Sequence, residues 1–170
     1  MFHSFQHTAF RLEVRDRYDS PYENTSLGKF LTAEQDDLPW MQDWLTMIRN
    51  AVGRGLIFSR VRIVSLPLTD YSRFGIWCAQ FTNSAGEDIR YLTRDQANSD
   101  ELPHHDYWLF DLSKLIRMHF DDGDHFLGGE FIEDPAEVVK HNYWRDIAWH
   151  RARRRDDFAS EQYDRRDQRS

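Results

Sequence analysis

The sequence predicts a single α+β domain, in which a mainly antiparallel sheet of about five strands is packed by three main helices. Two observations predict this class. Segments that alternate apolar and polar residues, as half-buried strands do, are interspersed with segments whose apolar residues recur every three or four positions, as in amphipathic helices. With 170 residues, 40% of them hydrophobic, the chain can bury one sizeable core.

The first 36 residues have the weakest periodicity, and we expect a partly irregular N-terminal segment there. Residues 10–14 alternate well enough for a short strand, although a helical turn fits nearly as well. Leu27, Phe30 and Leu31 have helical spacing, which predicts a short helix.

The clearest helix is predicted over residues 38–52, whose apolar positions follow a 3-4-3-4 rhythm. Asp36 or Asp37 is placed to cap its N-terminus, and Gly53 and Gly55 end it. A strand is expected next, over residues 57–64. Its face carrying Arg60 and Arg62 lies opposite Ile57, Val61 and Ile63.

A second long helix is predicted after Pro67, with Thr69 or Asp70 as its cap. Its apolar stripe consists of Tyr71, Phe74, Cys78 and Phe81. A short strand over residues 89–92 and a polar loop over residues 93–103 follow.

The last part of the sheet is predicted to be a meander of three strands, over residues 107–110, 115–120 and 126–132. The connections between them are so short that neighbouring strands must run antiparallel. A third main helix starts at Asp134-Pro135, which combine an acidic cap with proline in the first turn. Beyond Phe158 no apolar residue repeats, so we expect one domain over residues 1–158 and a flexible tail over residues 159–170.

Composition indicates a cytoplasmic protein without a membrane span. Cys78 is the sole cysteine, the N-terminus lacks the pattern of a secretory signal, and no apolar stretch approaches about 20 residues. The net charge of −7 argues against direct binding to nucleic acid, because phosphate neutralisation needs a basic surface. Neither the oligomeric state nor the strand order follows from the sequence.

Four segments of the chain resemble a family found in actinobacteria and known only as a domain of unknown function. The segments are residues 10–14 (FRLEV), 65–71 (SLPLTDY), 86–90 (GEDIR) and 106–121, which begins DYWLFD and ends MHFD. The resemblance spans residues 8–150. Members of that family are often encoded beside helix-turn-helix regulators of the XRE type. The resemblance therefore implies a protein partner in a regulatory or toxin–antitoxin-like pair, and it supplies no catalytic residues.

We expect neither a metal nor a cofactor. A zinc site would need His104 or His105 with Asp106 and a distant ligand such as His119 or His125, and a polar loop explains these residues more simply. The acidic run at residues 121–124 lacks the spacing of a calcium loop and fits a hairpin turn.

Arg145 and His150 are the candidate catalytic pair of an alternative enzymatic hypothesis. Their spacing matches that of some helical ribonucleases, in which histidine transfers protons and arginine stabilises phosphate charge. Cys78 lies on an apolar stripe and is expected to be a buried hydrophobic residue rather than a nucleophile.

The candidate binding residues are mostly cations of the predicted sheet. If the strand register permits, one face combines Arg60, Arg62, Arg90, Arg117 and His119. Such a face is either solvated or a platform for an anion or a protein partner. Further candidate binding residues are an aromatic anchor, Trp108 or its neighbour Tyr107, and, at the start of a helix, Tyr71 and Arg73.

Three functions remain open at this level. The first is a non-enzymatic interaction domain that works with a helix-turn-helix regulator. The second is a small enzyme or toxin that acts on RNA or nucleotides. The third is a sensor that binds a small anion on the arginine face.

Overall fold

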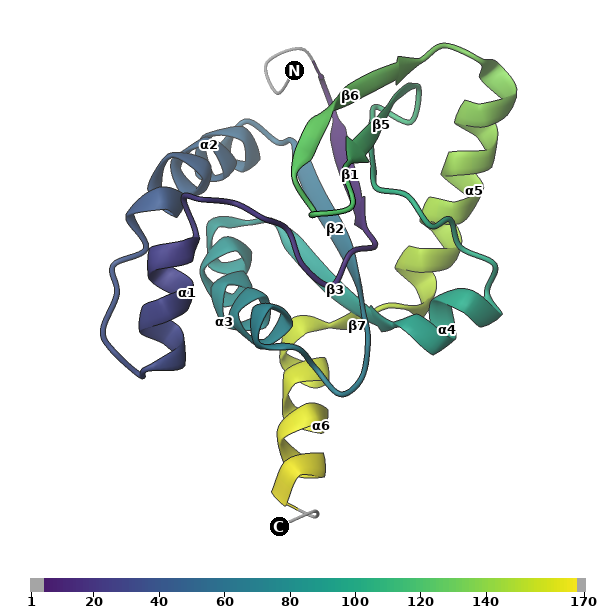
Figure 1. The fold of residues 1–170 in the computed structure, drawn as a ribbon. Helices are drawn as coiled ribbons and strands as arrows, with labels where there is room; N and C mark the ends of the chain where they lie inside the picture. The colour runs from purple at the N-terminus through teal and green to yellow at the C-terminus, as the bar shows by residue number, and fades with distance from the viewer. Residues whose placement is uncertain (1–4, 168–170) are drawn as a thin grey trace.

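The structure, a computed structural model, describes the backbone of residues 5–167 and the side chains of residues 5–162. A seven-stranded sheet with the order β6-β5-β4-β1-β2-β3-β7 lies at its centre (Figure 1). The strands are β1 (Thr8–Glu13), β2 (Ile57–Val64), β3 (Asp88–Thr93), β4 (Tyr107–Phe110), β5 (Lys114–Phe120), β6 (Phe126–Ile132) and β7 (Arg153–Arg154).

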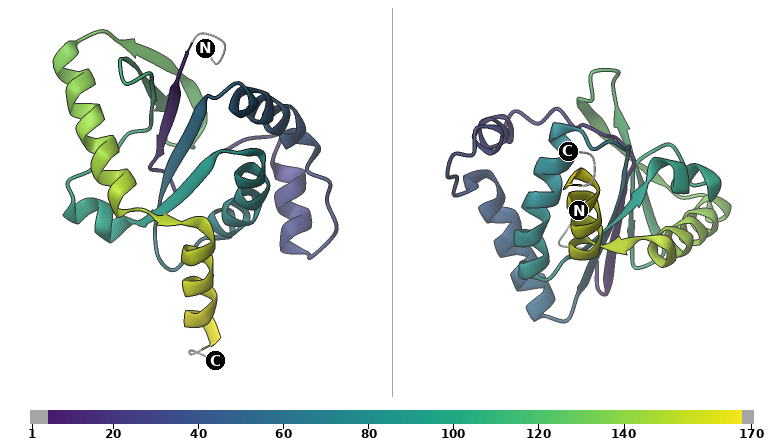
Figure 2. Two further views of the ribbon diagram at one scale, coloured as in Figure 1. Left: turned by 180° about the vertical axis from the view of Figure 1, so that it is seen from behind. Right: turned by 90° about the horizontal axis from the view of Figure 1, so that it is seen from below.

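Helices cover both faces of the sheet. They are α1 (Asn24–Leu31), α2 (Gln42–Gly53), α3 (Asp70–Ala85), α4 (Arg94–Ser99), α5 (Pro135–Arg151) and α6 (Arg155–Asp167), with a 3₁₀ turn at Pro39–Met41. Helices α1, α2 and α3 lie on one face and α4 and α5 on the other, as the view from below in Figure 2 shows. No helix in this range combines the length and the apolar composition that crossing a membrane takes.

The chain is a mixed α+β domain, but the predicted count of about five strands and three main helices is wrong. Residues 5–167 form seven strands and six α-helices. Two of the additional elements, β7 with two residues and α4 with six, are too short to produce a periodic pattern in the sequence.

The centre of the sheet is parallel. Strand β1 pairs in parallel with β2, and β2 with β3, while β4, β5, β6 and β7 each join antiparallel to a neighbour. The cause is the connections: the long helical segments before β2 and β3 carry the chain back so that each strand starts at the same end. Only the meander from β4 to β6 has the short connections that force antiparallel pairing.

Polar caps fix several of these elements. The Thr69 hydroxyl accepts the backbone N–H of Ser72 at the start of α3, and the Asp134 carboxylate accepts that of Ala136 at the start of α5, so both predicted helix starts are confirmed. Asp36, in contrast, pairs with Lys29 rather than capping α2.

The start of β1 is fixed by a carboxylate that follows the neighbouring strand β4. Asp111, at the end of β4, accepts backbone N–H groups from Gln6, His7 and Thr8 at 2.8–3.0 Å.

Successive residues of β1 and β2 enter different cores. Leu12 and Val61 are fully buried in an apolar core that α5 covers. Phe58 packs instead against α2 and α3. Helix α6 contributes Phe158 to a third apolar cluster, in which its ring stacks on Tyr91 with ring centroids 5.2 Å apart. The predicted tail therefore begins inside a helix that continues to Asp167, and residues 168–170 lie outside the described part of the chain.

Candidate functional site

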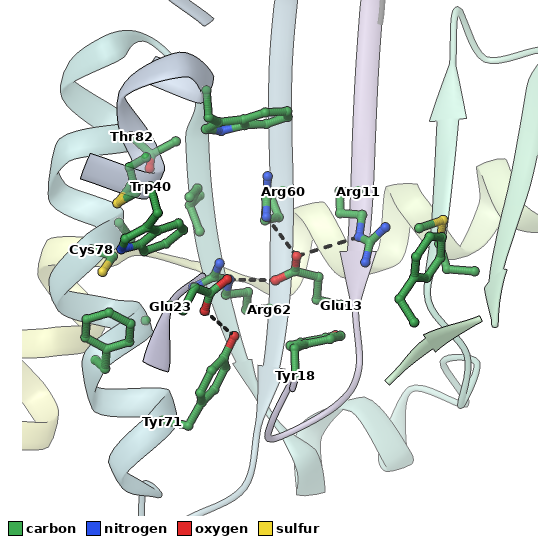
Figure 3. A pocket seen from close by; sticks show the side chains of 18 of the residues that line it. Arg11, Glu13, Tyr18, Glu23, Trp40, Arg60, Arg62, Tyr71, Cys78 and Thr82 are labelled. Atoms are coloured by element: carbon green, nitrogen blue, oxygen red, sulfur yellow. Dashed lines mark hydrogen bonds and ion pairs between the residues drawn. The ribbon is translucent and has the colours of Figure 1, made fainter. Parts of the chain in front are cut away.

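A cavity of about 350 Å³ lies between the sheet, helices α2 and α3, and Glu23 at the start of α1 (Figure 3). We refer to it as the central cavity. Its floor consists of charged side chains from β1 and β2: Arg11, Glu13, Arg60 and Arg62. Its walls are largely aromatic and include Tyr18, Trp40, Trp44, Tyr71, Phe74 and Trp108.

The floor follows from the strand register. Parallel pairing places Arg11 beside Arg60 and Glu13 beside Arg62. The carboxylate of Glu13 accepts hydrogen bonds from Arg60 Nη1 at 2.7 Å and from Arg62 Nε at 2.6 Å. Arg11 Nε is 3.6 Å from the same carboxylate. Glu13 is only 7% exposed, so it binds three guanidinium groups at the centre of the domain.

Two further carboxylates complete the network. Arg60 Nε donates to Glu87 at 2.8 Å, and Arg11 Nη2 donates to Asp106 at 2.9 Å. Asp106 also accepts the Tyr18 hydroxyl at 2.7 Å and a backbone N–H. Burial raises the pKa of Asp106, but the charge of Arg11 and the three donors directed at the carboxyl group favour its ionised form. The network therefore pairs three guanidinium groups, of Arg11, Arg60 and Arg62, with three carboxylates.

Aromatic rings enclose the guanidinium groups. The Arg60 guanidinium lies 5.7 Å from the Trp44 ring centroid and 5.8 Å from that of Trp108, and Arg11 lies 5.4 Å from Trp108. Cations at this range are attracted to the ring faces. The Trp44 indole N–H in turn donates to Glu87 at 3.2 Å.

Most titratable groups in the central cavity are held in one protonation state. Burial opposes ionisation of Glu13, but the charges of Arg62, Arg60 and Arg11 outweigh it and lower its pKa to about 2. Burial raises the pKa of the Cys78 thiol to about 12, which agrees with the predicted buried, non-nucleophilic cysteine.

Glu23 is the exception among these groups. Burial raises the pKa of Glu23, although the Tyr71 hydroxyl donates to it at 2.9 Å and the charge of Arg62 acts against the shift. Figure 3 shows the Glu23 carboxylate at the same end of the cavity as Arg62 and Tyr71.

Gly75 of α3 makes room for Arg62. A Cβ atom at this position would lie 2.7 Å from Arg62 Nη1. The guanidinium therefore occupies space that any other residue at position 75 would fill.

One comparison with known proteins identifies the family. A family model described as a domain of unknown function, DUF6879, matches residues 1–160. The chain belongs to this family. The match includes every residue of the central cavity named above. A search among curated proteins gave no match for this DUF6879 chain.

The DUF6879 fold brings together only part of the predicted binding set. Arg60, Arg62, Trp108 and Tyr71 line the central cavity. Arg60 and Arg62 lie on the sheet face that the helices cover and are paired with Glu13, so the predicted open platform does not form on this face.

The other predicted cations lie elsewhere because the register separates them. Parallel pairing aligns Arg90 with Val61 instead of Arg60, so Arg90 points to the α5 face and lies 3.8 Å from the Trp149 ring centroid. Arg117 and His119 also belong to that face, where Arg117 contacts Glu137 at 3.6 Å.

His119 and Arg73 each have an ionic partner. His119 contacts Glu130 at 2.8 Å, and Arg73 of α3 contacts Asp70, one turn away.

The alternative catalytic residues do not converge on a site in the DUF6879 structure. Arg145 Nε donates to Asp146, the next residue of α5, at 3.0 Å. His150 is exposed, and five helical positions separate it from Arg145 by roughly 140° around the helix axis.

His105 has a partner that the sequence did not indicate. Its Nε2 atom is 2.9 Å from Nε2 of the fully buried His141. Because His141 Nδ1 donates to the Glu137 carbonyl, His141 Nε2 is the acceptor and His105 is the donor. Burial lowers the pKa of His105 to about 4. Among residues 5–162 no cluster of three or more potential metal ligands occurs.

The sequence analysis missed the carboxylates of the site: Glu13 and Glu23, which line the central cavity, and Glu87 and Asp106, which pair with its arginines. The alternation of Arg11 and Glu13 within residues 10–14 was the available signal. It becomes informative only if that strand pairs in parallel with residues 57–64, which the pattern alone does not specify.

Proposed function

We propose that this DUF6879 protein is a non-enzymatic regulatory domain that binds a small molecule in the central cavity and acts through a helix-turn-helix regulator. The observation that carries the proposal is the cavity itself. Its volume of about 350 Å³ lies within the range of roughly 300–1,000 Å³ that is typical of ligand pockets. Aromatic walls with a few convergent polar groups are also typical of such pockets.

Fixed protonation states support a binding role rather than catalysis. A general acid or base works best with a pKa near the operating pH. Glu13 and Cys78 have pKa values of about 2 and 12, and burial raises the pKa of Tyr71 far above neutrality. Burial raises the pKa of Glu23 and of Asp106, but each carboxyl group accepts hydrogen bonds from neighbouring side chains, Glu23 from Tyr71 and Asp106 from Tyr18 and Arg11.

An exposed apolar strand supports a protein partner. Strand β6 forms one edge of the sheet, and Phe126, Leu127 and Phe131 on it are 55–66% exposed. Edges of this kind pair readily with another chain. The resemblance to a family encoded beside helix-turn-helix regulators suggests such a regulator as the partner.

The β5–β6 hairpin provides a physical connection between ligand and partner. Phe126 both lines the central cavity and lies on the exposed edge strand. The hairpin is held to the loop after β1 by Arg15 Nε, which donates to Asp124 at 2.7 Å. A ligand that shifts Phe126 therefore moves the strand that the partner contacts.

The alternative of an RNA- or nucleotide-acting enzyme or toxin has less support. Its residues Arg145 and His150 lie on different sides of α5, outside the cavity. Toxicity on expression that His150→Ala relieves would revive it.

Co-purification tests the proposed partnership. The tagged chain is co-expressed with a helix-turn-helix regulator of the XRE type, the kind encoded beside members of the family it resembles, and we expect a complex at micromolar concentrations. Leu127→Ser combined with Phe131→Ser is expected to weaken it at least tenfold. Val139→Ser, at an equally exposed apolar residue of α5, serves as the matched control. A complex that survives the double variant unchanged would remove β6 from the proposal, and the absence of any complex would remove the partner.

A further inference from the structure

The chemistry of the central cavity specifies its ligand more closely, and this inference rests on the proposed function. We propose that the cavity selects an uncharged, planar heteroaromatic molecule whose carbonyl group and N–H group lie side by side, as in an aromatic amide or a lactam ring. The arginine-rich floor therefore does not bind a small anion.

The first step is the charge balance of the floor. Arg11, Arg60 and Arg62 contact carboxylates at 2.6–2.9 Å. Their partners are Glu13, Glu87 and Asp106, each 7% exposed or less. Three positive charges are thus matched by three negative ones within the buried network. A negative charge on the ligand would lose its hydration without gaining an unpaired cation, which is costly at low dielectric constant. Burial raises the pKa of Glu23, the fourth carboxyl group of the cavity, so Glu23 offers a positively charged ligand only a weak counter-ion.

The second step concerns the walls. Trp40 and Phe74 lie with ring centroids 6.3 Å apart, and both line the cavity with Trp44 and Trp108. Ring faces and edges in this arrangement favour a flat aromatic body over an aliphatic or spherical one. The Trp40 indole N–H is buried and has no hydrogen-bond partner in the described structure, so a wall donor remains unsatisfied.

The third step concerns the polar end of the cavity. Arg62 donates through Nε to Glu13 and interacts with Tyr91, and its Nη1 lies beside Gly75, so the terminal nitrogens retain further N–H donors for a ligand. The neighbouring Glu23 accepts hydrogen bonds from the side chains of Tyr71 and Ser20, and the remaining lone pairs of its two carboxyl oxygens can accept another. A donor from Arg62 and an acceptor on Glu23 together match a ligand that presents a carbonyl oxygen next to an N–H.

Isosteric probes test the inference directly. Indole-3-carboxamide and indole-3-carboxylate have the same shape and differ in charge and in the N–H donor. Isothermal titration of each into the full chain is expected to give at least tenfold tighter binding of the carboxamide. Inosine, a lactam of larger size, is expected to bind as well, and inorganic phosphate is expected not to.

Substitutions inside and outside the central cavity test whether the ligand binds there. Glu23→Gln keeps one acceptor oxygen for Tyr71 but loses the second, so carboxamide binding is expected to weaken about tenfold. Asp43→Asn, at an exposed carboxylate of α2, is the matched control and leaves binding unchanged. Trp40→Ala removes a wall and is expected to abolish binding. Trp149→Ala, a comparable truncation on the opposite face of the sheet, retains it.

Each contrary outcome is decisive. Equal or tighter binding of the carboxylate or of phosphate would overturn the charge argument. An unchanged affinity in Glu23→Gln would overturn the assignment of the polar end. If neither the carboxamide nor inosine binds at millimolar concentration, the ligand class is wrong. The proposed function would then still stand if some other molecule from a metabolite extract bound in a Trp40-dependent manner, and would fail if none did.

Discussion

The two faces of the central strands differ in chemistry, although alternate residues of the same segments form them. On the α5 face, Leu12 and Val61 are fully buried among apolar side chains. On the other face, Glu13 and Arg62 are neighbours in the register and hold a charged network beneath three helices. One face is a conventional core, and the other is the floor of a cavity.

This difference shows that a charged strand face need not be a solvated one. An antiparallel sheet, as the sequence predicts, usually exposes its polar face to water, whereas parallel strands such as β1 and β2 are usually covered on both faces. Here the polar face is covered, and paired carboxylates replace the water. A buried network of this kind stabilises the fold only while it is complete, since removal of one partner leaves an uncompensated charge.

The largest expected losses of stability come from one substitution on each face, at two neighbouring residues of β1. Glu13→Gln leaves Arg60 and Arg62 without their shared carboxylate and is expected to cost about 3–5 kcal/mol of unfolding free energy at pH 7. Leu12→Ala on the α5 face is expected to cost about 2–5 kcal/mol through the cavity it creates. Urea denaturation measures both. Glu133→Gln, an exposed carboxylate, is the control. A loss below about 1 kcal/mol for Glu13→Gln would mean that the network is not a structural element.

The two faces are expected to lose stability in two different pH ranges as the pH is lowered, which we call the upper and the lower window. The pKa of His105 falls from 6.5 in the unfolded chain to about 4 when folded, so the unfolded state binds the proton more tightly. Stability on the α5 face is therefore lost as the pH falls from 6.5 to about 4. The loss is on the order of 2 kcal/mol after screening.

Glu13 acts in the lower window. Its pKa falls from 4.5 to about 2 on folding, so its contribution of about 3 kcal/mol is complete above pH 4.5 and is lost towards pH 2. Denaturation curves between pH 7 and pH 2 measure both windows. His105→Gln should reduce the upper window, to which His141 also contributes because burial lowers its pKa, and Glu13→Gln should remove the lower window. Loss of both windows in either variant would contradict the separation.

A smaller effect on stability is expected at Gly75. Gly75→Ala gains helix propensity of about 1 kcal/mol but presses on Arg62 Nη1, so thermal denaturation should reveal a net loss of about 1 kcal/mol. Gly53→Ala in α2, where a Cβ meets open space, should stabilise slightly. If both variants behave alike, Arg62 is free to move and Gly75 is not required for its position.

The smallest effect on stability is expected at the edge strand. Phe131 is 55% exposed, and Phe131→Ser should change the unfolding free energy by no more than about 0.5 kcal/mol. Urea denaturation checks this expectation. A loss above about 2 kcal/mol would mean that Phe131 belongs to the folded core and is not available to a partner.

The sequence was most informative where a signal is local. The helix caps Thr69 and Asp134 depend on neighbouring residues, and the structure confirms both. The meander from β4 to β6 also followed from its short turns.

The arrangement of the cavity depends on pairings between distant segments. Arg60 and Arg90 appear equivalent in the sequence, yet the register directs them to opposite faces. Glu87 and Asp106 meet Arg60 and Arg11 only because β1 lies at the centre of the sheet, and no local pattern specifies that position.

The most direct test of a ligand-binding cavity is native mass spectrometry of the full chain after exposure to a metabolite extract. We expect wild type to gain the mass of one small molecule. Trp149→Ala is expected to gain it too, and Trp40→Ala to lose it. No added mass on wild type, or the same added mass on both tryptophan variants, would contradict a ligand in the central cavity.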